Sequence, residues 1–328
     1  MSFRSVRVLL LLAAVLWTAV DTPAPIVYRP GEGWSYEPVG GTKWTRTRAK
    51  EQLDVAQEAF DAKDYKLSFK AARRVTRVWP FSDYAPQAQY LVGRSQEERG
   101  NDEKAFKAYQ TMMEKYPKSE NYEDVLQRQY VIANRYLAGQ WFKLWGVIPF
   151  FPSMDKTVQM YEKLIKNGPF SEVAPHAQMN IGAAREKQSD YPEAVKAYEQ
   201  AADRYHDRKQ VAADALYKAA EAYLKQAKTA EYDQSIAGRA IATYTDFMTL
   251  YPDDPRAAEA REKISSLRTE QARGNVLVAK FYEKKKRWDG ALVYYNEAIV
   301  RDPQSKYADE ARKRIEEIKK RTLKTALN

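Results

Sequence analysis

The chain has 328 residues, of which 44% are hydrophobic and 30% are charged, and its net charge is +10. This length accommodates one long repeat array or two compact domains. The absence of cysteine excludes disulfide bonds, thiolate metal sites and cysteine nucleophiles, and two histidines are few for a transition-metal site. The positive net charge is compatible with binding to nucleic acid, to anionic lipid or to acidic partners, and it does not distinguish among these possibilities.

The N-terminus has the features of an export signal. Arg4 and Arg7 precede an apolar run at 8–20, which is shorter than the ~20 residues of a membrane-spanning helix. We therefore predict a signal peptide at 1–20 and an exported protein. An uncleaved N-terminal anchor is the alternative. Because the chain has no cysteine, it cannot be a lipoprotein that is anchored through a lipidated cysteine.

Residues 21–48 are rich in proline and glycine, so they are expected to be extended. The segment also contains Tyr28, Trp34, Tyr36 and Trp44, which are many aromatic residues for a simple linker. We predict that it docks on its own chain or on a partner. A flexible tether is the alternative.

An internal repeat begins after this segment. Residues 84–117 and 173–206 align without gaps and share Ala-Pro, Ala-Gln, Gly, Glu, Lys-Ala-Tyr and a late Tyr at the same offsets. Their length is the ~34-residue period typical of the tetratricopeptide repeat (TPR), a pair of antiparallel helices. Gly93 and Gly182 are predicted to allow close helix approach, and Tyr109 and Tyr198 to fill the space toward the next pair.

The predicted fold class is all-α: a TPR solenoid over 49–327, forming a right-handed superhelix of about six helix-turn-helix units plus a capping helix. The capping helix is expected from Ser305 to about Leu323. Two interruptions are expected, an apolar insertion at 139–153 and a polar loop near 228–235. The further units are placed at 49–82, from 122 to 169, from 210 to 252 and at 272–305.

Catalysis finds no support in the residue pattern. His176 and His206 are separated and lack a recognisable orienting partner, and no glycine-rich phosphate loop is present. The carboxylates lie on helical faces mixed with lysine, where they typically form solvated pairs. We predict a protein that is not an enzyme and has no cofactor or metal.

The insertion is a candidate contact site for a partner or for lipid, because a large exposed apolar patch usually marks such a site. If it is helical, Trp141 and Trp145 lie one turn apart and form one anchoring face. The alternative is an insertion folded back on its own repeats. The candidate residues are Trp141, Phe142, Leu144, Trp145, Ile148, Phe150 and Phe151.

A basic stripe is predicted on the second helix of the first unit, suited to anionic lipid or to an acidic partner. The alternative is a solvated face interleaved with Glu58, Asp61 and Asp64 of the preceding helix and turn. Nucleic acid is disfavoured because the chain carries an export signal and no nucleic-acid motif. The stripe comprises Lys66, Lys70, Arg73, Arg74 and Arg77.

First helices of a TPR array line its concave groove, so their exposed side chains are candidates for reading an extended peptide. In the second unit these are Gln87, Tyr90, Arg94 and Glu97. Ordinary contacts between repeats are the alternative role.

The stretch 240–311 resembles the BamD (YfiO) family. The resemblance rests on the tract around Tyr244 and Phe247 that ends in Tyr-Pro-Asp, on Val-Ala-Lys-Phe-Tyr at 278–282, and on Asp-Pro-x-Ser at 302–305. The segment 79–85, Trp-Pro-Phe-Ser-x-Tyr-Ala, is similar to that family's first link between repeats. Family members also carry an insertion in a central repeat.

This resemblance implies a periplasmic TPR protein at the inner face of the outer membrane. Such a protein helps to assemble β-barrel outer-membrane proteins, binding the barrel assembly subunit through its later repeats and receiving unfolded outer-membrane protein segments. This chain departs from the family in having no cysteine and one more repeat than usual. The alternative is a soluble periplasmic TPR scaffold that coordinates cell-wall or envelope-division proteins. Peripheral membrane contact is a further expectation.

Overall fold

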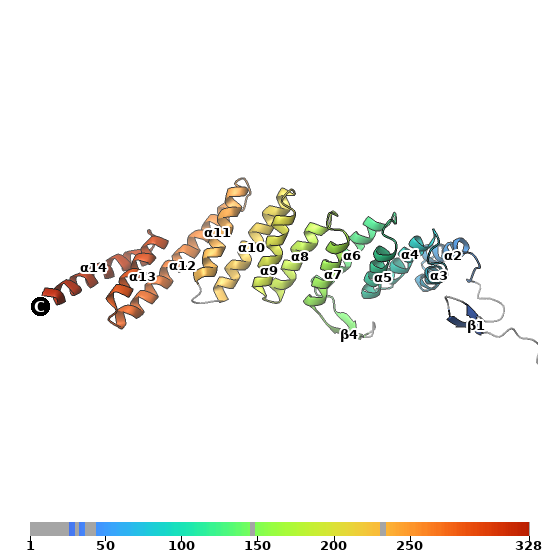
Figure 1. The fold of residues 1–328 in the computed structure, drawn as a ribbon, viewed down its shortest axis with the longest axis horizontal. Helices are drawn as coiled ribbons and strands as arrows, with labels where there is room; N and C mark the ends of the chain where they lie inside the picture. Colours follow the sequence, from blue (N-terminus) through green and yellow to red (C-terminus); the bar gives the residue numbers. More distant parts are fainter. Residues whose placement is uncertain (1–25, 30–32, 37–43, 145–147, 230–233, 328) are drawn as a thin grey trace, which may run out of the picture. The chain divides into compact units, whose positions relative to one another are not determined.

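Figure 1 shows a computed structural model of the chain, in which helices follow one another from α2 to α14. The structure describes residues 26–29, 33–36, 44–144, 148–229 and 234–327. Within these ranges it is helical except for two short two-stranded sheets, so the predicted all-α fold class is confirmed. The chain divides into an N-terminal unit, Met1–Ile132 with Lys143–Pro149, and a C-terminal unit, Ala133–Phe142 with Phe150–Asn328.

The helices are arranged in sequential pairs within each unit. The N-terminal unit contains α2 (Ala49–Asp61), α3 (Tyr65–Val78), α4 (Ala85–Glu98), α5 (Asp102–Lys115) and most of α6 (Tyr122–Leu137). The C-terminal unit contains α7 (Met154–Asn167), α8 (Ala174–Lys187), α9 (Tyr191–Arg204), α10 (Lys209–Thr229), α11 (Gln234–Leu250), α12 (Ala257–Lys284), α13 (Trp288–Arg301) and α14 (Lys306–Leu327).

The turn inside a helix pair has the same conformation at four places. Its middle residue has a left-handed φ, at Lys63, Gly100, Ser189 and Lys286. The following N–H bonds to a carbonyl five residues earlier, as from Asp64 to Ala59 at 2.8 Å, which closes the helix end. The α6 helix ends in this same turn at Gly139, where Gln140 donates to the Arg135 carbonyl at 3.0 Å. The insertion therefore begins where other pairs start their second helix.

Close helix packing within a pair depends on a tyrosine that lies on a glycine. A Cβ atom on Gly93 would lie 2.2 Å from Cε1 of Tyr109, and one on Gly182 would lie 2.4 Å from Cε1 of Tyr198. The tyrosine ring thus occupies the space that a side chain would need. The sequence identified these positions, but the two tyrosines contact the first helix of their own pair as well as filling space toward the next.

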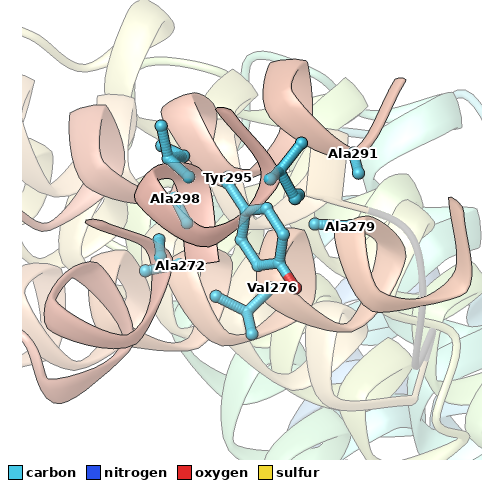
Figure 2. Close-up of a cluster of buried hydrophobic side chains, with 9 residues drawn as sticks. Ala272, Val276, Ala279, Ala291, Tyr295 and Ala298 are labelled. Atoms are coloured by element: carbon cyan, nitrogen blue, oxygen red, sulfur yellow. The ribbon is translucent and has the colours of Figure 1, made fainter. Parts of the chain in front are cut away.

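The predicted start of the sixth unit at 272 was wrong, because α12 begins at Ala257 and continues to Lys284 without a break. Its first half supplies Ala260 and Ile264 to the core formed with α10 and α11. Its second half packs on α13 and α14, and Figure 2 shows Tyr295 of α13 directed toward α12 between Val276 and Ala279. One continuous helix therefore closes one pair and opens the next.

Both non-helical segments contain strands. In the 21–48 segment, β1 (Ile26–Arg29) pairs antiparallel with β2 (Gly33–Tyr36), with Ile26 opposite Tyr36. Trp44 packs against the core of α2, α3 and α4, whereas the side chains of Tyr28, Trp34 and Tyr36 lie outside the described part. In the insertion, β3 (Phe142–Leu144) pairs with β4 (Ile148–Phe151).

The predicted signal peptide lies outside the described residues, and so does most of the predicted loop at 228–235. Within the ranges that the structure describes, no helix combines the length and the apolar character needed to cross a bilayer.

We expect Gly93→Ala to destabilise the protein by about 1–3 kcal/mol, because the added methyl group collides with the Tyr109 ring. Urea unfolding followed by circular dichroism measures the effect. The matched control is Gly238→Ala on α11, where an added Cβ has its nearest neighbour at 4.0 Å. This control should stabilise the protein by up to about 1 kcal/mol through helix propensity. Equal effects of the two substitutions would contradict the packing interpretation.

Candidate interaction surfaces

The four predicted groove residues lie together on α4, and two of them are bonded to the next pair. The Tyr90 hydroxyl donates to Oδ2 of Asp124 on α6 at 2.7 Å, and Nη1 of Arg94 donates to the Tyr90 oxygen at 3.0 Å. The Arg94 guanidinium also lies 5.1 Å from the centre of the Phe60 ring on α2. Tyr90 and Arg94 therefore join three first helices of the N-terminal unit.

Gln87 and Glu97 are also engaged within the chain. Oε1 of Gln87 accepts from Nδ2 of Asn121 at 2.8 Å. Oε2 of Glu97 accepts from the Tyr109 hydroxyl at 2.7 Å and from Nη1 of Arg128 at 3.3 Å. The structure brings the four residues together and gives each an intramolecular partner. Their role in reading a peptide stays a prediction.

The contact at Glu97 belongs to a repeated arrangement, which we call the tyrosine clamp. In each clamp a second-helix tyrosine donates to a first-helix glutamate, and a cation from a later helix pairs with that glutamate. The tyrosine–glutamate distances are 2.7, 2.8 and 2.8 Å. The three clamps are Tyr109–Glu97–Arg128, Tyr198–Glu186–Lys225 and Tyr295–Glu283–Arg314. The shared offsets of Tyr and Glu in the sequence signal this arrangement, but the pairing was not predicted.

Burial shifts the acidity of the clamp tyrosines. Desolvation, together with the adjacent carboxylate of Glu97 or Glu186, raises the pKa of Tyr109 and Tyr198 well above the ordinary value. Burial and the hydrogen bond to Glu283 raise the pKa of Tyr295 to about 12. The clamp therefore requires protonated tyrosines, because only the neutral hydroxyl donates to the glutamate.

The apolar insertion is partly buried and is not a helix in its described part. Phe142 is buried and stacks on Tyr136, with ring centres 4.1 Å apart. The Lys156 ammonium lies 4.9 Å from the Phe142 ring and 5.1 Å from the Phe151 ring. Trp141 is half exposed. Phe142 thus serves the protein's own packing, and its expected contact with a partner or lipid is wrong for this conformation.

The other insertion residues are less fully described. Trp145 lies outside the described residues, as do the side chains of Leu144, Ile148 and Phe150. Because residues 142–144 form a strand, Trp141 is not followed by the helical turn that was expected to align it with Trp145. The backbone N–H of Lys143 donates to Oε1 of Glu103 at 2.7 Å, which fixes this strand on the N-terminal unit.

Four of the five predicted stripe residues form an exposed line on α3, which we call the α3 row: Lys66, Lys70, Arg73 and Arg77. No described carboxylate forms an ion pair with any of these four side chains, so both the predicted binding role and the alternative of a solvated face stay open. Arg74 does not belong to the row. It is buried, its Nε has no hydrogen-bond partner among the described residues, and its guanidinium lies 5.7 Å from the Trp79 ring.

Two surfaces of the C-terminal unit were missed by sequence reasoning. A groove of about 690 Å³ lies over α7, α8 and α9, with Val158, Ile165 and Ile181 in its lining and the exposed Phe170 beside it. The second surface is apolar and comprises Leu277 and Phe281, which are exposed one helical turn apart on α12. We call it the α12 apolar patch.

Within the described ranges, no group of three or more histidine, aspartate or glutamate side chains could hold a metal ion. His176 is exposed, and Nδ1 of His206 lies 2.9 Å from the Asp203 carbonyl oxygen.

Comparison with known families agrees with the resemblance seen in the sequence. Residues 152–302 match the sequence model of the YfiO family, described as outer membrane lipoprotein, and residues 87–119 match a tetratricopeptide-repeat model. The matched region includes most of the 240–311 tract and excludes the 79–85 link. No curated protein sequence matches the chain.

Among solved structures, this chain is similar to several TPR proteins. The C-terminal part of a TPR protein from Cytophaga hutchinsonii is 14% identical, covers 81% of this chain and 88% of its own, and has a TM-score of 0.37. A TPR protein from Parabacteroides merdae is 14% identical, with coverages of 80% and 96% and a TM-score of 0.34. One from Thermus thermophilus is 16% identical, with coverages of 67% and 98% and a TM-score of 0.29.

We expect Glu97→Ala to destabilise the protein by about 1–3 kcal/mol, because it leaves the buried Tyr109 hydroxyl without an acceptor. Its neighbour provides the control: Glu98 is exposed and pairs with Arg94 at 3.5 Å, so Glu98→Ala should change stability by less than about 1 kcal/mol. Denaturant titration compares the two. The clamp would be energetically unimportant if both substitutions had the same small effect.

The clamp also predicts a loss of stability at alkaline pH. The pKa of such a tyrosine is higher in the folded than in the unfolded state. Its contribution to stability is complete below pH ~10, the ordinary tyrosine pKa, and is lost as the pH rises through the pKa of the folded state. For Tyr295 this window runs from about 10 to about 12, with a slope of up to ~1.4 kcal/mol per pH unit. Tyr295→Phe should therefore lose stability less steeply than the wild type between pH 9.5 and 11. Parallel slopes in thermal unfolding would rule this out.

Proposed function

Since this chain is a tetratricopeptide-repeat protein of the BamD (YfiO) type, we propose that it is a non-catalytic interaction protein in the assembly of β-barrel proteins into the outer membrane. It works in the periplasm at the inner face of the outer membrane. Its partners are the barrel assembly subunit and segments of unfolded outer-membrane proteins. Repeat arrays present extended surfaces suited to such partners.

The observation that carries this proposal is the position of the α12 apolar patch within the YfiO-matched region. When α12 and α4 are aligned on their clamp glutamates, Leu277 corresponds to Leu91 and Phe281 corresponds to Ser95. Leu91 and Ser95 are both buried on α4. On α12 the preceding second helix, α11, packs near Ala260 and Ile264 instead. The face of α12 that carries Leu277 and Phe281 is left exposed, and exposed apolar surface of this kind marks interaction sites.

A soluble periplasmic scaffold for cell-wall or envelope-division proteins is the second candidate. The observation that favours it is the complete absence of cysteine, the residue that is lipidated in a lipoprotein. Fractionation separates the two candidates, because a scaffold stays in the soluble fraction after lysis whereas an assembly component sediments with the outer membrane.

The partner surface is tested by crosslinked pull-down from envelope membranes. We expect the wild type to recover a β-barrel outer-membrane protein, and Leu277→Asp with Phe281→Asp to lower the yield about tenfold or more, because apolar anchors dominate interface energetics. The control is Val131→Asp, an exposed apolar position on α6 of the N-terminal unit. Recovery of no barrel protein by the wild type would refute the assignment, and equal recovery by both variants would refute the surface.

A further inference from the structure

The outer face of α3 combines the α3 row with a fully exposed phenylalanine. The four cations span about 16 Å along the helix at ~1.5 Å per residue, and α3 contains no acidic residue. Phe81 follows four residues after Arg77, in the turn beyond the end of α3 at Val78, and it is 99% exposed. Among the described residues these four cations form no ion pair, and an exposed aromatic side chain follows them closely in the chain.

Phe81 is held in this position by its turn. The Tyr116 hydroxyl of α5 donates to the Pro80 carbonyl at 3.0 Å. The backbone N–H and the hydroxyl of Ser82 both donate to the Trp79 carbonyl, at 3.1 and 2.9 Å. These bonds tie both flanks of Phe81 to the repeat. Its exposure is therefore a property of a fixed turn.

The same turn recurs after α7 and provides an internal comparison. Phe170 is 89% exposed, and the Tyr205 hydroxyl donates to the Pro169 carbonyl at 3.3 Å. The helix before it differs in charge, however. The positions that correspond to the α3 row are Asp155, Gln159, Glu162 and Lys166 on α7. The repeat thus presents the phenylalanine twice, but only the N-terminal unit adds a cationic row.

We propose that the α3 row and Phe81 bind the surface of an anionic phospholipid membrane. Lysine and arginine side chains are attracted to anionic headgroups, while an aromatic side chain enters the boundary between headgroups and acyl chains. An exposed row of cations along one helix can face a plane of headgroups, whereas a peptide usually needs a groove for its anchoring side chains. The inference extends the proposed function, because it supplies membrane attachment to a chain that has no cysteine.

Flotation with lipid vesicles tests the proposal on the full-length protein. The vesicles contain phosphatidylcholine with 30% phosphatidylglycerol, or phosphatidylcholine alone. We expect binding to the anionic vesicles only, with weakening at high salt. Changing all four row residues to Gln should weaken binding by about 600-fold, since each cation contributes about fivefold. Phe81→Ser should weaken it about tenfold.

Two controls separate this site from the general attraction of a basic protein. The first changes four exposed cations of the C-terminal unit to Gln: Lys284, Lys313, Lys319 and Lys320. The second is Phe170→Ser, which removes an equally exposed phenylalanine from the same turn. Both should bind anionic vesicles within about threefold of the wild type. Circular dichroism verifies that every variant is folded.

Three results would overturn the proposal. Equal losses in the row variant and in the charge control would mean attraction by net charge alone. Binding to neutral vesicles, or binding that survives in every variant, would place attachment elsewhere in the chain. Loss of the β-barrel partner from the row variant, without vesicle binding by the wild type, would make the row a protein-binding surface. Failure of the proposed function is distinct, because the wild type would then recover no barrel protein while vesicle binding is unaffected.

Discussion

The repeats depend on the contact between a buried tyrosine and a small residue on the neighbouring helix. At Gly93 and Gly182 the tyrosine ring lies where a side chain would be, so the two helices of a pair can come close together. The buried hydroxyl then needs an acceptor, and a glutamate one turn after the small residue supplies it. A cation from a later helix forms an ion pair with this glutamate. The tyrosine therefore links packing within one helix pair to contacts with the next helix pair.

This coupling determines which surfaces are left for partners. The polar residues of α4 that face the next pair are engaged in hydrogen bonds and ion pairs, so binding through them would compete with the protein's own cohesion. Exposed side chains without such engagement are found elsewhere: in the α3 row with Phe81, and in the α12 apolar patch. The first combines charge with one aromatic residue, whereas the second is apolar. They suit different partners, an anionic surface and a protein.

The family assignment and the composition together raise the question of membrane attachment. The YfiO family is described as outer membrane lipoprotein, and this chain contains no cysteine to be lipidated. Attachment through the protein surface needs both charge and apolar contact, because either alone is weak and reversible. The α3 row and Phe81 offer both within one helix and its following turn.

The sequence alone was sufficient to predict the helix pairs, the TPR period and the close packing at Gly93 and Gly182. These features follow from residue size and spacing within a short stretch of chain, which periodicity reports directly. The α4 residues that it predicted for a peptide groove are bonded within the chain, which the sequence offered only as their alternative role. Tertiary structure alone decided that Arg74 and Phe142 are buried, that α12 is continuous from Ala257, and that Leu277 and Phe281 are exposed. The physical reason is that a side chain's exposure depends on which neighbouring helix covers it, and the repeat pattern does not encode where that helix ends.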